Sequence, residues 1–318
     1  MNQISRNNNF IIFPILLVIF YFIDNIIYFG NKNIFDFINF GIPFTNIKIN
    51  FSSIDIFVSG NELTFFSIVM ACLTIEFFIQ KAKSGEEIYM RPIAAMKAME
   101  EAVGRATEMG SSILYVPGIS GLDEIDTISG VIVLGHIAGM TAEYEADLHV
   151  PCCVPIVMEA AKESCKEAYL KKGRPDLYNE NMVHYVTDDQ FAYAAGVNGI
   201  MLREKPAAVF FQGKFYAESL LLAETGSSIG AIQIAGTGSS SQIPFFVTAC
   251  DYVLIGEEFY AASAYLSGSP EMIGSIKGQD YVKLLCIIFI GIVVALSIID
   301  YFGLSLINIS NLFRTNIQ

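Results

Sequence analysis

The sequence predicts an α/β fold: a doubly wound, mostly parallel sheet of about six strands in three layers, flanked by transmembrane helices. Two observations support this prediction. Short apolar runs recur through the middle of the 318-residue chain, and each ends in a small-residue or acidic turn that leads into a helical pattern. Strongly apolar segments stand at both ends of the chain and raise its mean hydropathy to +0.49.

The apolar ends predict three membrane spans, at residues of about 10–29, 63–80 and 284–302. Residues 1–83 would hold the first two spans and a short external segment, in which residues 47–51 alternate like a strand. Residues 84–282 would form a cytosolic, Rossmann-like α/β domain, and residues 283–318 the third span and a short tail. Lys81, Lys83 and Lys283 flank the spans and place this domain in the cytoplasm of a multi-pass protein of the cell membrane.

Charge restricts the partners of the chain. The formal net charge is −13, and nearly all of it falls in the central domain. Such a domain repels nucleic acid, which binds through clustered Lys and Arg, so we expect no nucleic-acid partner. The expected partners are the lipid bilayer, further copies of the same chain in a homo-oligomer, and a small-molecule ligand. The six cysteines lack metal-ligand spacing, and we predict neither a disulfide nor a metal site.

The central domain is predicted to begin with an amphipathic helix at residues 92–109. The stretch 125–148 contains a strand-like run, but Gly135 and Gly139 favour a closely packed helix that ends at His149. Pro151 and Pro206 are each expected just before a strand. The predicted strands cover residues of about 112–116, 153–157, 182–186, 207–212, 230–235 and 251–255.

The loops after these strands would meet at one edge of the sheet, where open α/β folds bind ligands. Besides Glu159, Gln212 and Gly213, the residues expected there include the candidate ligand-binding residues Gly118, Ser120, Asp188, Asp189, Gly236, Thr237, Gly238, Ser239, Glu257 and Glu258. None of these residues is Lys or Arg. Their carboxylates could serve acid–base chemistry or hold a divalent cation, although helix capping explains them without a ligand.

Established catalytic patterns are missing from the sequence. The loop GTGSSSQ could surround a phosphate with backbone N–H groups, but it lacks the lysine of a P-loop and is not G-x-G-x-x-G. A structural turn or a contact surface between subunits explains this loop equally well. No serine stands in a G-x-S-x-G elbow. The pattern therefore identifies no cofactor and no catalytic residue, and it leaves open whether the chain is an enzyme.

Three segments resemble a known family. They are AAMKAMEEAVGRATEMG at 94–110, FAYAAGVNGIM at 191–201 and QIAGTGSSSQIPFFVTACDYVLIGEEFYAASAYLSGSP at 233–270. Residues of about 85–283 resemble bacterial and archaeal membrane-anchored proteins that are classed only as a domain of unknown function. The resemblance implies a membrane-tethered cytosolic α/β domain and brings no activity or site residue with it.

Three classes of function remain after these observations. The first is a membrane-anchored binding or assembly module. The second is an enzyme or sensor that holds a nucleotide or sugar over Gly118, Asp188, Gly236, Thr237 and Glu257, with a Mg²⁺ ion as a further option. The third is a transporter component, which three spans could build only as an oligomer. The binding or assembly module is the preferred interpretation.

Overall fold

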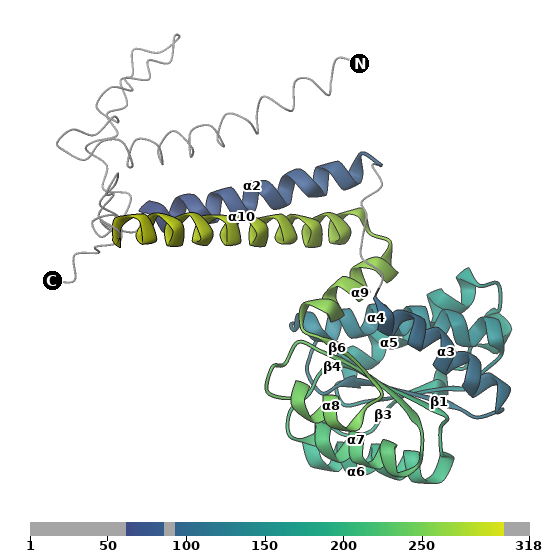
Figure 1. Cartoon of the computed structure of the whole chain (residues 1–318). Coiled ribbons are helices and arrows are strands. Elements are labelled where there is room, and N and C mark those ends of the chain that lie inside the picture. Colours follow the sequence, from purple (N-terminus) through teal and green to yellow (C-terminus); the bar gives the residue numbers. More distant parts are fainter. Residues whose placement is uncertain (1–61, 86–92, 302–318) are drawn as a thin grey trace. The chain divides into compact units, whose positions relative to one another are not determined.

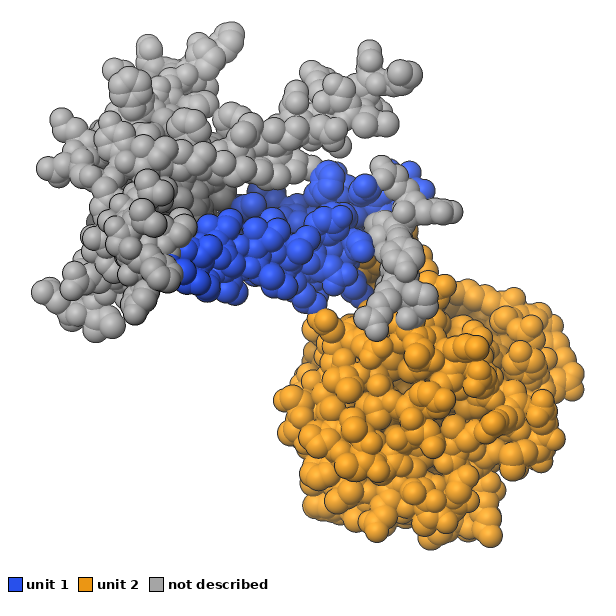
Figure 2. Space-filling view, in the orientation of Figure 1, with its two compact units in different colours: residues 1–88, 274–318 blue, residues 89–273 orange. Residues whose placement is uncertain are grey.

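A computed structural model describes residues 62–85 and 93–301 of the chain (Figure 1). The chain divides into two compact units, shown in different colours in Figure 2. One unit comprises Met1–Ile88 and Gly274–Gln318, and the other comprises Tyr89–Ile273. The first predicted span, the strand-like run at 47–51 and the tail lie outside the described residues.

The Tyr89–Ile273 unit is built on one sheet of six parallel strands. Their order across the sheet is β3-β2-β1-β4-β5-β6. The strands are β1 (Ile113–Gly118), β2 (Leu148–Cys152), β3 (Val183–Tyr185), β4 (Ala208–Lys214), β5 (Ile232–Thr237) and β6 (Tyr252–Ile255). In β1 every residue is buried, as expected for a parallel strand that is covered on both faces. The predicted six-stranded parallel α/β sheet is confirmed.

Helices cover both faces of this sheet (Figure 1). One face is covered by α3 (Ala94–Glu108), α4 (Ile125–Tyr144), α5 (Pro155–Lys171) and α9 (Glu257–Ser267). The other face is covered by α6 (Gln190–Glu204), α7 (Glu218–Ser228) and α8 (Ile243–Ala249). Two short 3-10 helices, η3 (Pro175–Leu177) and η4 (Glu180–Met182), connect α5 to β3. Each face has its own apolar cluster, and Tyr115 and Phe210 belong to the first and Phe211 and Phe246 to the second.

Helix α4 explains part of the high mean hydropathy without a membrane. It is long and apolar enough to cross a bilayer, but 67% of its apolar segment is buried inside the structure. The Tyr115 hydroxyl of β1 donates to the Gly130 carbonyl of α4 at 2.5 Å, and a Cβ at Gly130 would lie 2.5 Å from the Gln212 carbonyl oxygen. Helix α4 is therefore a core helix, and the helix favoured for this stretch is confirmed.

The second strand differs from the prediction. It was expected at residues 153–157, but β2 covers Leu148–Cys152 and α5 begins at Pro155. Pro151 therefore lies inside β2, and His149 lies in the strand and does not end a helix. The apolar run continues past the strand because Val157 in the first turn of α5 is also buried. Glu159 consequently lies further along α5, on the surface, where its carboxylate pairs with Lys162 at 3.2 Å.

The other unit contains the apolar helix α2 (Glu62–Lys83) and, from Gly274 on, the apolar helix α10 (Pro270–Tyr301). They pack closely at two glycines one helical turn apart. A Cβ at Gly274 would lie 2.6 Å from Cα of Ile79, and one at Gly278 would lie 2.6 Å from Cα of Ile75. The Phe78 and Tyr281 rings stack beside them with centroids 4.5 Å apart. Gly274 and Gly278 thus give α10 the small-xxx-small spacing that lets two helix backbones approach.

Buried thiols give the fold a predicted sensitivity to alkali. Burial raises the pKa of Cys152 and of Cys165 from 9.0 to about 12. Above pH 9 the unfolded chain releases these protons while the folded chain keeps them, so the free energy of unfolding should fall as pH rises. Each thiol contributes up to ~1.4 kcal/mol of this loss between pH 9 and 10. Denaturant unfolding of the full chain at pH 8, 9 and 10 measures the slope. Cys165→Ala should reduce it, and an unchanged slope would contradict the assignment.

Candidate functional site

The candidate site is the carboxyl edge of the sheet, where the strands lead into the helices. Strand order reverses between β1 and β4, which are neighbours although α4, α5 and α6 separate them in the chain. The helix after β1 covers one face of the sheet and the helix after β4 covers the other. Such a switch point is where open α/β sheets, including the dinucleotide-binding folds with this strand order, bind ligands.

At this switch point the backbones of β1 and β4 lie unusually close together. Pairing shifts register between Val116 and Gly118, so that Gly118 lies opposite Lys214. The backbone angle φ is +80° at Gly118 and +142° at Gly213, and residues other than glycine rarely adopt such values. A Cβ at Gly118 would collide with the Lys214 carbonyl oxygen, and one at Gly213 would collide with the Pro117 carbonyl oxygen. These glycines let the two strands approach each other closely at their carboxyl ends.

An ion pair joins the two sides of the switch point above these glycines. Lys214 Nζ, at the end of β4, lies 2.5 Å from a carboxylate oxygen of Glu124, which precedes α4. The same ammonium group lies 5.8 Å from the ring centroid of Tyr216. The hydrogen bond with Glu124 is the main reason why the pKa of Lys214 is raised above its ordinary value. The lysine therefore stays charged and is neutralised by its own partner.

A second network ties α4 to α9 and to the loop after β5. Asp126, 7% exposed, accepts a hydrogen bond from the Tyr260 hydroxyl of α9 and one from the Gly238 N–H at 3.2 Å. Burial, the hydrogen bond to Asp126 and the charge of Asp126 raise the pKa of Tyr260. A Cβ at Gly238 would collide with the Tyr260 hydroxyl and lie 2.6 Å from Asp126 Oδ1. The glycine is needed here for packing against side chains of the protein.

The Gly236 backbone in β5 is also packed tightly against side chains of the protein. A Cβ at this position would collide with Oε1 of Gln212 and lie 2.8 Å from the Phe259 ring. Gln212 is fully buried, and its Nε2 donates to the Ile234 carbonyl at 3.0 Å. Its Oε1 has no hydrogen-bond partner among residues 93–301. Gly236 and Gly238 thus create room that side chains of the protein occupy.

On the opposite face, the loop after β4 is held by a buried carboxylate. Glu218, the first residue of α7, is fully buried and accepts from the Tyr216 N–H at 2.9 Å and from Gln190 Nε2 at 2.5 Å. Next to it, the Ser219 hydroxyl donates to Gln242 Oε1 at 2.8 Å. These contacts join α6, α7 and α8 just below the strand ends, so the loops are supported by polar side chains on both faces.

The pKa of the Cys153 thiol is influenced by carboxylates at this edge. This pKa is raised from 9.0 to about 11, mainly by burial and then by the negative charges of Asp188, Glu218 and Asp189, in that order. Between residues 93 and 301, the loops after the strands and the first turns of the following helices contain eight carboxylates and no basic residue. The one basic side chain at the strand ends is Lys214, which is paired with Glu124. The carboxyl edge is therefore strongly acidic.

Five of the predicted ligand-binding residues come together near the switch point, and a sixth adjoins them. Gly118 ends β1, the Ser120 carbonyl accepts from the Thr127 hydroxyl at 3.4 Å, and Thr237 Oγ1 accepts from the Ser239 N–H at 3.2 Å. Gly236 and Gly238 belong to the packing contacts above. All of these residues are used in contacts within the protein.

The four remaining candidates lie elsewhere along the edge. Asp188 and Asp189 follow β3, whereas Glu257 and Glu258 follow β6, and these strands are the two outermost of the sheet. With about 4.8 Å between neighbouring strands, the two pairs are roughly 24 Å apart. Asp189 caps α6 by accepting from the Ala192 N–H at 2.8 Å, as expected for a first-turn carboxylate. The two pairs thus follow strands at opposite sides of the sheet.

The sequence prediction missed the residues with the most contacts. Glu124, Asp126, Lys214, Glu218 and Tyr260 form the networks at this edge. Lys214 also corrects the expectation that no Lys or Arg lies at the strand ends. Asp126 gave a weak signal, because an acidic residue at the start of an otherwise apolar helix marks its N-terminus.

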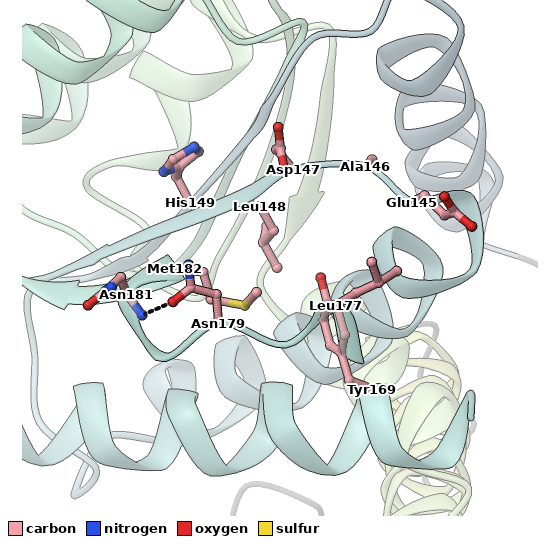
Figure 3. Close-up of a pocket in the computed structure, with 10 residues that line it drawn as sticks. All are labelled: Glu145, Ala146, Asp147, Leu148, His149, Tyr169, Leu177, Asn179, Asn181 and Met182. Carbon is pink, nitrogen blue, oxygen red and sulfur yellow. Dashed lines mark hydrogen bonds between the residues drawn. The ribbon is translucent and has the colours of Figure 1, made fainter. Parts of the chain in front are cut away.

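A cavity of about 290 Å³ lies at the opposite edge of the sheet, near the start of β2 (Figure 3). Figure 3 shows the Glu145 carboxylate, which Arg174 binds at 2.7 Å, pointing away from the other lining side chains. No group of three metal-ligating side chains occurs in the described parts of the chain. The residues that line the cavity are Glu145, Ala146, Asp147, Leu148, His149, Tyr169, Leu177, Asn179, Asn181 and Met182.

Comparison with known proteins assigns the chain to a family. The profile of a domain of unknown function, DUF6754, matches residues 52–307. The chain belongs to the DUF6754 family. No curated protein and no solved structure matches the chain. The resemblance to an uncharacterised family is thereby confirmed, and the match extends beyond the Tyr89–Ile273 unit on both sides.

The Asp126–Tyr260 contact should stabilise the fold. Tyr260→Phe removes one of the two donors to a buried carboxylate, and we expect a loss of about 1–3 kcal/mol in the free energy of unfolding. The matched control is Tyr265→Phe in the same helix, because that ring is 55% exposed. Chemical denaturation of the full chain compares the two variants. Equal stability of both would show that the hydroxyl contact contributes nothing.

The charge around Cys153 can be tested separately. Asp188→Asn removes the carboxylate that raises the pKa of this thiol most, so the pKa should move down from about 11. At pH 9 the alkylation rate of Cys153 should rise about two- to fivefold, since Asp188 is exposed and its charge is partly screened. Asp188 is not among the groups that raise the pKa of Cys152, which makes Cys152 an internal control. Peptide mass spectrometry after timed alkylation gives both rates, and a parallel change in Cys152 would contradict the electrostatic cause.

Proposed function

We propose that the chain is a membrane-anchored docking module, in which the apolar helices hold the protein in a bilayer and the carboxyl edge of the α/β unit binds a partner protein. One observation carries this proposal: the switch point is closed by the protein itself. The strands meet through Gly118 and Gly213, and the Glu124–Lys214 pair bridges the strand ends above them. Strand ends that the chain bridges with its own side chains suit a contact between surfaces better than the enclosure of a small ligand.

Charge further disfavours the nucleotide alternative. Phosphates bind where helix N-termini and basic residues face them. At this edge the N-termini of α4, α6, α7 and α9 are accompanied by carboxylates, and the single lysine is neutralised by Glu124. A phosphate would have to approach these carboxylates without a compensating cation. The docking role is therefore preferred over a nucleotide-binding enzyme.

The membrane part of the proposal rests on α10 and α2. Residues Pro270–Ala295 are long and apolar enough to cross a bilayer, and only 6% of the apolar segment is buried. Exposed apolar side chains such as Ile287, Ile290 and Ile298 would lie in contact with lipid. The resemblance to membrane-anchored proteins and the lysines beside the predicted spans support a multi-pass arrangement with the α/β unit in the cytoplasm.

The docking surface can be located by site-specific photocrosslinking in the producing cell. A photoreactive phenylalanine analogue replaces Tyr216, Phe191 or Ile156 at the carboxyl edge, all of which are exposed. Leu202 and Met109, exposed near the opposite edge, are the control positions. We expect the same adduct, a single discrete species, from the three carboxyl-edge positions and from neither control. Adducts from the controls alone would overturn the proposed surface.

Membrane insertion can be tested by labelling one native cysteine, Cys286, and one introduced cysteine. Cys286 lies exposed in α10, so a bilayer around this helix should shield it from a water-soluble maleimide. In vesicles Ser84→Cys, beside Lys83 at the end of α2, should be labelled while Cys286 is not. Mass spectrometry of the labelled peptides measures both. Rapid labelling of Cys286 in intact vesicles would show that α10 is exposed to water.

Self-association of the chain stays a prediction. The close packing of α2 on α10 uses Gly274 and Gly278 and leaves the other faces of α10 exposed. These faces could contact lipid or the helices of another copy. Native mass spectrometry of the full chain released from detergent gives the number of protomers, together with any co-purified ligand.

A further inference from the structure

We infer that the segment docking on the carboxyl edge is a basic amphipathic segment of a partner protein. This inference rests on the proposed docking function and specifies the chemistry of the partner. It is drawn from the coincidence, on one edge of the sheet, of a negative field and exposed apolar side chains. Each of these features alone has a simpler explanation, since carboxylates cap helices and single exposed apolar residues are common.

The apolar part of the surface lies along the carboxyl ends of β1 to β4. We select six of the large apolar side chains exposed there, 43–66% each, which come from both faces of the sheet. The apolar side chains on one face belong to the first turns of α4 and α5. The apolar side chains on the other face stand at the end of β3, at the start of α6 and just before α7. The six residues are Ile125, Ile128, Ile156, Tyr185, Phe191 and Tyr216. We call them the edge apolar residues.

The acidic part is interleaved with the edge apolar residues. Asp123 and Glu124 directly precede Ile125, and Asp188 and Asp189 stand between Tyr185 and Phe191. Gln190, next to Asp189, donates to Glu218 at 2.5 Å, so the starts of α6 and α7 lie side by side. Burial is the main cause of the raised pKa of Cys153 nearby, and the charges of Asp188, Glu218 and Asp189 add to it. A partner segment with alternating apolar and basic side chains can therefore contact the edge apolar residues and the carboxylates between them at the same time. An amphipathic helix is the simplest such segment, because it presents apolar anchors at helical spacing with Lys and Arg beside them.

Other occupants fit this surface less well. Anionic lipid headgroups carry the same sign of charge as the edge and are repelled. A second copy of the chain would bring its own acidic edge. Two basic residues of the opposite edge are already paired within the chain: Lys172 binds Glu143 and Arg174 binds Glu145, each at 2.7 Å. A basic, partly apolar protein segment is the occupant that charge complementarity selects.

The experiment measures binding of a defined probe to the full chain in lipid nanodiscs. The probe is a fluorescent amphipathic helical peptide of leucine and lysine, compared with its analogue in which glutamate replaces lysine. We expect the lysine peptide to bind, to weaken about tenfold or more between low and physiological salt, and to bind far better than the glutamate peptide. Binding of both peptides, or of neither, would overturn the inference.

Matched variants locate the binding to the edge. Asp123→Asn combined with Asp188→Asn should weaken the lysine peptide about tenfold and remove much of its salt dependence. Phe191→Ser should weaken it through the apolar contact. Glu108→Gln combined with Glu180→Gln, at the opposite edge, removes the same number of charges and should have no effect. An equal loss in the two charge variants would show general attraction to an acidic protein and overturn the inference.

Failure of this inference is distinguishable from failure of the docking function. The charge variants alter exposed side chains only, so their unfolding midpoints should match that of the unaltered chain, and binding is compared on that basis. Photocrosslinks from Tyr216, Phe191 and Ile156 together with no binding of the lysine peptide would leave the docking surface in place and overturn the basic partner. Absence of both the photocrosslinks and the peptide binding would overturn the docking function as well as the basic partner.

Discussion

The close backbone contact between β1 and β4 is the constraint on which the rest of this edge depends. Gly118 and Gly213 adopt positive φ values so that each can face a carbonyl oxygen of the other strand. In folds with this strand order, glycines at the same place let a dinucleotide approach the backbone. Here they let the protein approach itself. The polar side chains next to these strand ends bind one another, as Glu124 binds Lys214 and Asp126 binds Tyr260.

The acidic character of the edge follows from the same architecture. A doubly wound sheet directs the N-termini of its crossover helices to the carboxyl edge, and carboxylates stabilise those N-termini through capping and the helix dipole. Asp189 and Glu218 illustrate this role, since each accepts hydrogen bonds from backbone N–H groups at the start of a helix or just before it. Their charges add to a field that acts at a distance. In the proposed docking role, the carboxylates that stabilise the helix N-termini therefore also select the partner.

Much of the fold could be predicted from local pattern, whereas the networks of the site could not. Five strands and the long helices follow from apolar runs and turn residues. The second strand was displaced because the apolar run continues from β2 through Pro155 into the buried first turn of α5. Lys214 and Glu124 are 90 residues apart, and Tyr260 and Asp126 are 134 apart. Only the strand order brings them together, and the same order separates Asp188 from Glu257. Crossover rules restrict the possible orders without selecting one.

The most direct test of the closed, acidic edge is a methyl NMR titration of the full chain in nanodiscs with labelled isoleucine. Ile125, Ile128 and Ile156 lie exposed at the edge, and Ile113 and Ile234 are buried references in β1 and β5. Magnesium ATP, NAD and the lysine-rich peptide are added in separate titrations. We expect the nucleotides to leave all five resonances in place and the peptide to shift only the three edge methyls. Saturable shifts of the edge methyls with ATP or NAD, and none with the peptide, would contradict this expectation and restore a nucleotide site at the switch point.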